Sequence, residues 1–177
     1  MQRRSFIKAM AVASAAQALP SWAQAYPVKP IRMVIAFPPG GPTDIVSRVV
    51  AAKLSEQMGQ QVVVENRPGA GGNLGAEAVA RAAPDGYTIF YNTSAITIAP
   101  ALYSKVSFDP VRDFVPVGLS ATVPLILVAS PTLPIKNLAE FIAYARSKGG
   151  NINYASSGTG TITHLAAALF SKEMGIR

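Results

Sequence analysis

Three short loops rich in glycine, serine and threonine carry the residues best suited to hold a small anion. They read PPGGPT at residues 38–43, NTSAIT at residues 92–97 and SSGTGT at residues 156–161. Glycine lets a ligand approach the backbone closely, and N–H groups at the start of a helix favour a carboxylate or a phosphate. Any single loop is more simply interpreted as a tight turn, because proline and glycine are the commonest turn residues. Only the three together indicate a binding site.

Other kinds of site have weaker support in the motifs. The stretch GAGGNLG at residues 69–75 has Leu74 where the dinucleotide-binding motif requires its third glycine, and no G-K-[ST] sequence occurs. His164 is the only histidine, so a histidine-based metal site lacks partners and we expect neither a metal nor a cofactor. A hydrolase that uses Ser156 or Ser157 with His164 stays an alternative, although Ala155 replaces the first glycine of the G-x-S-x-G motif. We favour a local hydrogen bond for His164 in the first turn of a helix.

The pattern of apolar residues predicts alternating strands and helices around these loops. Strand, helix and strand at short spacing favour an α/β fold with a mostly parallel sheet. Thr43 is the predicted N-cap of the first helix, and Gly59 the predicted stop. The predicted strands are Ile31–Phe37, Gln61–Glu65, Tyr87–Tyr91, Val115–Ser120, Leu125–Ala129 and Ile152–Ala155, and the other predicted helices are Leu74–Ala83, Leu138–Arg146 and Ile162–Met174.

Each of the three loops leaves the carboxyl end of a predicted parallel strand. In open α/β sheets, ligands bind at this edge. The first and third loops also lead directly into a predicted helix, whose N-terminal N–H groups suit a carboxylate. The sequence therefore predicts that the three loops surround one anion site.

The N-terminal residues indicate export. Residues 1–25 combine three basic residues, a short apolar stretch and an A-x-A site, which is typical of a signal peptide cleaved after about Ala25. The Arg3–Arg4 pair also resembles a twin-arginine signal, and an ordinary secretory signal is an equal alternative. Cleavage would leave 152 residues and lower the net charge from +7 to +4, because residues 1–25 hold Arg3, Arg4, Lys8 and no acid. The remaining basic residues are scattered, which argues against nucleic-acid binding.

Three stretches resemble one known family. FPPGGPTD, VVVENRPGAGGNLGAEAVARAAPDGYT and YASSGTGTITHLAAALF are similar to the periplasmic substrate-binding proteins of tripartite tricarboxylate transporters, the Bug family. The resemblance implies a type II periplasmic binding-protein fold, in which two lobes close on a small carboxylate such as a dicarboxylate, tricarboxylate, amino acid or aromatic acid. It also implies a periplasmic, non-enzymatic monomer that delivers its ligand to a membrane permease. A receptor that serves a membrane sensor is an alternative.

The resemblance also assigns lobes and ligand-binding residues. We expect a first lobe at residues 26–126 that lacks its C-terminal return segment, and the start of an incomplete second lobe at residues 127–177. Family members are longer, so a truncated or non-functional remnant is a further alternative. The residues expected at the ligand are Phe37, Pro39, Gly40, Gly41, Thr43, Thr93, Ser94, Ser156, Ser157, Gly158, Thr159 and His164.

Overall fold

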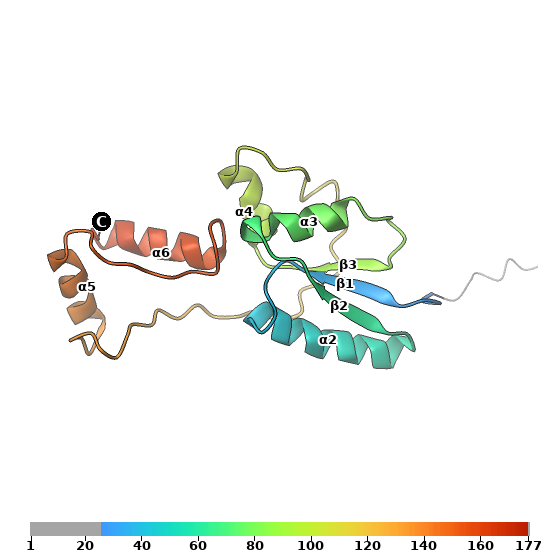
Figure 1. The fold of residues 1–177 in the computed structure, drawn as a ribbon, viewed down its shortest axis with the longest axis horizontal. Helices are drawn as coiled ribbons and strands as arrows, with labels where there is room; N and C mark the ends of the chain where they lie inside the picture. Colours follow the sequence, from blue (N-terminus) through green and yellow to red (C-terminus); the bar gives the residue numbers. More distant parts are fainter. Residues whose placement is uncertain (1–25, 177) are drawn as a thin grey trace, which may run out of the picture.

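The computed structural model describes residues 26–176, so the predicted signal peptide at residues 1–25 lies outside the described residues. Strands and helices alternate through the first part of the chain, and helices alone follow (Figure 1). The elements are β1 (Ile31–Ile35), α2 (Pro42–Met58), β2 (Val62–Asn66), the short 3₁₀ turn η1 (Ala70–Gly72), α3 (Asn73–Ala80), β3 (Thr88–Tyr91), α4 (Ala95–Leu102), α5 (Leu138–Ser147) and α6 (Ile162–Glu173).

The sheet has three parallel strands in the order β2-β1-β3. Met33 in the central strand is paired with Val64 on one side and with Ile89 on the other. Both neighbours are reached by crossovers through helices, as parallel pairing requires. The predicted parallel α/β arrangement is confirmed for this part of the chain.

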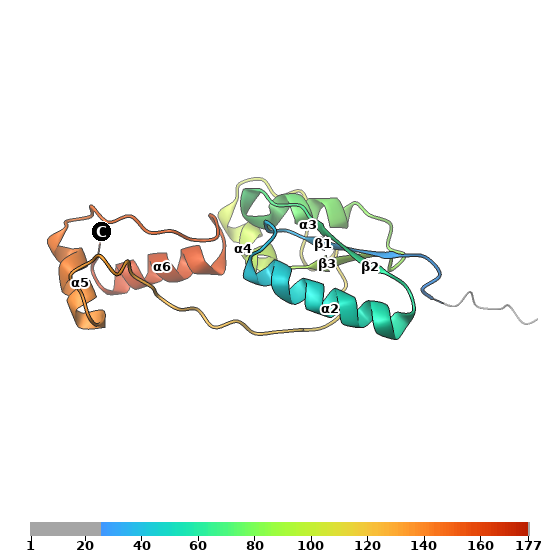
Figure 2. The ribbon, with the colours of Figure 1, turned by 60° about the horizontal axis from the view of Figure 1, so that its bottom comes forward.

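Strand β1 is the centre of the core because helices cover both of its faces. Figures 1 and 2 show α2 on one face of the sheet and α3 with α4 on the other. Ile31 and Met33 pack with Ala51 of α2, whereas Ala76 of α3 packs with Ala99 of α4. Burying a large apolar side chain contributes about 1.5–3 kcal/mol. A strand whose four apolar residues are all buried is therefore the firmest part of this fold.

Helix α2 begins two residues earlier than the sequence predicts. Gly41 is its N-cap residue and Pro42 its first residue, so the prediction of Thr43 as the N-cap is wrong. Proline is favoured at the first helical position because it has no N–H group to leave unpaired and its φ is already helical. The predicted stop is confirmed: Gly59 adopts φ 67° and donates its N–H to Ser55 O over 3.1 Å.

Three predicted strands, Val115–Ser120, Leu125–Ala129 and Ile152–Ala155, are wrong, since none of these segments forms a strand. Within the described residues they pair with no neighbouring strand, and a strand needs the backbone of a neighbour to bond with. Val117 is 90% exposed and Val128 81% exposed. Figure 1 shows residues 115–135 as an extended connection between the sheet and α5.

Helices α5 and α6 form a separate pair at the end of this connection (Figure 2). The rings of Phe141 and Phe170 lie 6.2 Å apart between centroids, and Arg146 Nε donates to Met174 O over 2.7 Å. Both helices occupy the predicted ranges to within a residue. Among the helices of residues 26–176, none is both long enough and apolar enough to cross a bilayer.

Candidate functional site

The turn η1 is the point at which the ends of β1 and β3 come together. Gly72 is buried there. A β-carbon placed on Gly72 would lie 3.3 Å from Ala36 Cβ, 3.8 Å from Phe37 Cζ and 4.0 Å from Ala95 Cβ. Phe37 directly precedes the first predicted loop and Ala95 lies within the second. Both loops are therefore held beside the same glycine.

The third loop reaches the neighbouring glycine. A β-carbon on Gly71 would overlap the carbonyl oxygen of Thr159 and would lie 2.7 Å from Tyr103 Oη. Tyr103 donates a hydrogen bond of 2.8 Å to that same carbonyl oxygen. Gly160, the next residue along the loop, is buried. We call residues 37–43, 92–95 and 156–161, gathered around η1, the loop cluster; Figures 1 and 2 both show the start of α6 beside α4.

Asp44 fixes the first loop through hydrogen bonds from the protein interior. Its side chain is only 3% exposed and accepts hydrogen bonds from Gly40 N (2.9 Å), Arg48 Nε (3.0 Å) and Asn66 Nδ2 (2.9 Å). The Arg48 side chain, the Gly40 N–H group and the Asn66 amide hold the pKa of Asp44 far below its usual range. The Gly40 N–H group is thus occupied within the chain. This differs from the expectation that it faces a ligand.

The start of α2 leaves other N–H groups without an intrahelical acceptor. The first backbone hydrogen bond of the helix runs from Ile45 N to Gly41 O over 3.0 Å, and no side chain caps the helix. Pro42 has no N–H group, so Gly41, Thr43 and Asp44 supply the donors that every helix start leaves unpaired. These donors and the positive end of the helix dipole favour an anion.

Hydroxyl groups of α6 organise the third loop. Ser157 Oγ lies 2.7 Å from Thr163 Oγ1, which also accepts a hydrogen bond from Ser157 N over 3.1 Å. Thr161 Oγ1 donates to Gly158 O over 2.6 Å. Thr161 is the N-cap residue of α6, but its side chain does not bond to the free N–H groups of the helix. Helix α6 therefore also begins without a side-chain cap.

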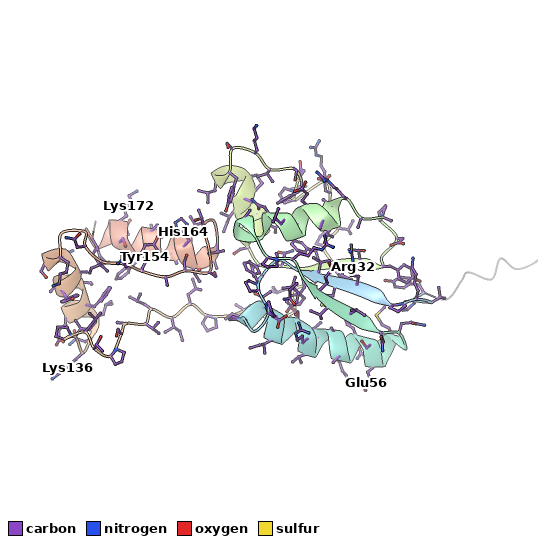
Figure 3. The ribbon with its side chains drawn as sticks, viewed as in Figure 1. Arg32, Glu56, Lys136, Tyr154, His164 and Lys172 are labelled. Carbon is purple, nitrogen blue, oxygen red and sulfur yellow. The ribbon has the colours of Figure 1, made fainter. Side chains whose placement is uncertain are left out.

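His164 lies in the first turn of α6, and Figure 3 shows it on that helix. Its Nδ1 accepts a hydrogen bond of 3.4 Å from Gly160 N, which is the local interaction that the sequence favoured. Within residues 26–176 no hydrogen bond joins His164 to a serine, because Ser157 bonds to Thr163 and Ser156 Oγ accepts from Gly158 N. The geometry does not favour the hydrolase alternative, which needs a nucleophile bonded to its base.

The second loop leads into α4, a helix that the sequence patterns did not predict. Ser94 is its N-cap residue and makes no side-chain cap, and Ala95 N donates to Thr93 Oγ1 over 3.3 Å. All three loops therefore end at a helix start. In the described part of the chain, no group of three or more potential metal-binding side chains occurs.

Helix α5, which begins away from the loop cluster, differs from these helices in its N-terminal cap. Asn137 Oδ1 accepts a hydrogen bond of 2.9 Å from Glu140 N, and Asn137 Nδ2 donates to Glu140 Oε1 over 2.9 Å. This reciprocal arrangement satisfies the helix start locally. In contrast, α2 and α6 begin at the loop cluster and have no side-chain cap. At α4, the first N–H groups are bonded within the second loop, to Thr93 and Ser94.

Comparisons with known proteins identify the family. Residues 46–177 match the model of the tripartite tricarboxylate transporter family receptor. The chain belongs to this family. Among solved structures, it is 38% identical to the periplasmic binding protein BugD, with a TM-score of 0.81. It is 37% identical to an R. palustris protein determined with adipate (TM-score 0.83) and 36% identical to MatC from Rhodopseudomonas palustris with bound malate (TM-score 0.77).

These structural matches fix the fold class. Each covers 86% of this chain and 51% or 52% of the known chain. The chain also spans about half the length of the curated relatives that it matches, 45% and 51% for two of them. The described α/β unit with its parallel sheet is thus the periplasmic binding-protein fold over the matched half.

Sequence reasoning missed the residues that hold the loop cluster together. A spacing of four residues between Asp44 and Arg48 indicates an ion pair on one helix face, and this pair is present at 3.0 Å. Nothing in the pattern indicates that Asp44 is buried or that it bonds to Gly40 and Asn66. Tyr103 carries no recognisable signal.

Proposed function

We propose that the protein captures a small organic anion in the periplasm and delivers it to the membrane permease of a tripartite tricarboxylate transporter. Its family supports this proposal, and so do the adipate and malate in the structures of two relatives. Both ligands carry two carboxylates. These relatives favour a dicarboxylate, and the proposed ligand class also includes tricarboxylates, amino acids and aromatic acids.

The observation that carries this proposal is the absence of side-chain caps at the helix starts of the loop cluster. Uncapped N–H groups at α2 and α6 suit a carboxylate, because such groups are otherwise satisfied only by water or by a ligand. The loop cluster itself contains no charged residue. The ligand would therefore be held by main-chain N–H groups and hydroxyl groups among the residues that line it. Pro39, which has no N–H group, and Gly40, whose N–H group is bonded to Asp44, would line the site without donating. The lining residues would be Phe37, Pro39, Gly40, Gly41, Thr43, Thr93, Ser94, Ser156, Ser157, Gly158, Thr159 and His164.

The proposed mechanism is closure of two lobes on the ligand without any covalent step. Residues 26–126 would form the first lobe, and residues 127–177 would belong to the second. Closure brings the starts of α2 and α6 around one anion, and the closed form is what the permease recognises. Such a receptor works as a monomer and needs no cofactor.

Thermal unfolding of the mature protein with and without ligand tests this function. Millimolar adipate or malate should raise Tm, because a ligand that binds only the folded state stabilises it by about 2.7 kcal/mol at a hundred times its Kd. Adipamide, the uncharged diamide of adipate, is the matched control and should give no shift. A panel of dicarboxylates, tricarboxylates, amino acids and aromatic acids that leaves Tm unchanged would contradict the proposal.

A further inference from the structure

Asp44 is the one charged side chain of this region that is almost fully buried, and its position is unusual for a buried carboxylate. It lies in the first turn of α2, directly behind the uncapped N–H groups. A carboxylate at a helix start normally caps that helix or faces solvent. Asp44 instead turns back toward the loop that precedes the helix, where it accepts the N–H group of Gly40.

Asn66, at the end of β2, completes the support of this loop. Its Nδ2 donates one hydrogen bond to Asp44 Oδ1 (2.9 Å) and the other to Phe37 O (3.0 Å). Its Oδ1 accepts from Arg48 Nη2 over 3.1 Å. Every polar atom of the Asn66 side chain is thus used. The first loop is fixed at its start, Phe37, by Asn66 and at its middle, Gly40, by Asp44.

Gly40 depends on this support because it has few other contacts. It is exposed, its φ is 83°, and a β-carbon on it would meet no atom within 4 Å. A glycine in open space has many accessible conformations. The hydrogen bond to Asp44 is what selects one of them.

Arg48 allows a buried carboxylate to lie beside an anion site. Its side chain contacts both carboxylate oxygens of Asp44, with Nε 3.0 Å from Oδ2 and Nη2 3.0 Å from Oδ1. A bidentate pair of this kind compensates the negative charge within the chain. The negative charge of Asp44 is therefore compensated by Arg48 and does not oppose a carboxylate bound by the helix dipole and the N–H donors.

We propose that Asp44 is a positioning residue, which together with Asn66 presets the first loop so that its donors already face the ligand. This inference rests on the proposed function, in which that loop holds the ligand. If the loop is preset in this way, ligand binding does not incur the entropy cost of ordering the loop. When the competent loop conformation is only partly populated, the apparent Kd rises in inverse proportion to that population.

The test is the Kd for adipate, measured by calorimetry on the mature protein at a temperature well below the Tm of every variant. Asp44→Ala releases the loop at Gly40 and Asn66→Ala releases it at Phe37, and each should raise Kd by about tenfold. Ala51→Gly is the control for stability alone, because Ala51 is buried in the same helix away from the loop. It should lower Tm and leave Kd unchanged.

The outcomes separate the two proposals. Wild-type binding with an unchanged Kd in both loop variants overturns the positioning role and leaves the proposed function intact. An equal loss of affinity in Ala51→Gly also overturns it, because stability alone would then explain the loss. Failure of the wild-type protein to bind adipate, malate or any acid of the panel overturns the proposed function, and the positioning role with it. If Asp44→Ala does not fold, Asn66→Ala decides the result.

Discussion

The starts of α2 and α5 solve the same physical problem in opposite ways. Each helix begins with N–H groups that have no intrahelical acceptor. At α5, Asn137 and Glu140 satisfy these groups locally on an exposed surface. At α2 no side chain does so, and the nearby carboxylate, Asp44, bonds to the preceding loop.

This difference separates a helix start that serves stability from one that serves recognition. A local cap stabilises its helix and removes the donors from further use. An uncapped start keeps its donors available, but the chain must then fix the loop in another way. In this protein the second solution occurs where three loops meet around two glycines, Gly71 and Gly72.

The largest expected effect comes from filling that meeting point. Gly71 and Gly59 have nearly the same φ, 66° and 67°, but only at Gly71 would a β-carbon overlap a neighbour, the Thr159 carbonyl. Gly59→Ala should cost about 1 kcal/mol, the penalty for a left-handed residue. Gly71→Ala adds steric overlap and should cost about 3 kcal/mol or more. Chemical denaturation measures both, and equal costs would show that the third loop does not rest on this turn.

The pH dependence of stability tests the role of Asp44. Its folded-state pKa is depressed by Arg48, Gly40 and Asn66, so its ionised form stabilises the fold. The stability advantage of the wild type over Asp44→Asn should be fully present above about pH 4, the ordinary pKa range of aspartate, and should shrink as pH falls. Urea denaturation at several pH values measures this difference. A difference that grows with acidity would contradict the assignment.

The smallest effect concerns the capped helix. Asn137→Ala removes the cap of α5 and should cost about 1 kcal/mol of stability. It should leave the Kd for adipate unchanged, because this helix start does not face the loop cluster. Asn151→Ala, which removes an exposed asparagine beyond the end of the same helix, is the control. A large loss of affinity in Asn137→Ala would erase the distinction between the two helix starts.

Much of the first α/β unit follows from the sequence alone. A largely apolar run, in which Arg32 is the one charged residue, forms the central strand β1, and helical spacing with a terminal glycine predicted α2 up to Met58. These predictions succeed because burial and backbone geometry act locally. Helix α4 was missed since it is short, almost entirely apolar and contains Pro100, so no periodic pattern marks it.

Predictions failed where the structure depends on distant partners. The segments around Val117 and Val128 have the composition of strands, but within the described residues neither pairs with a strand. The three loops and their residue types were predicted as a group. The loops are brought together by the buried Asp44, by Tyr103 and by Gly71 and Gly72 of η1. These residues act through contacts between distant parts of the chain, which no local sequence pattern contains.

A side-chain cap introduced at α2 provides the most direct measurement. Gly41 has φ −79° and ψ 167°, which any residue adopts, and a β-carbon there would meet only Pro38 O at 3.7 Å. In Gly41→Ser, the new hydroxyl oxygen would accept from the first N–H groups of the helix, whereas Gly41→Ala adds the same bulk without an acceptor. If these N–H groups hold the ligand, Gly41→Ser should bind adipate at least tenfold more weakly than Gly41→Ala while unfolding at the same or a higher temperature. Equal adipate affinities in the two variants would show that the carboxylate is not held at the start of α2.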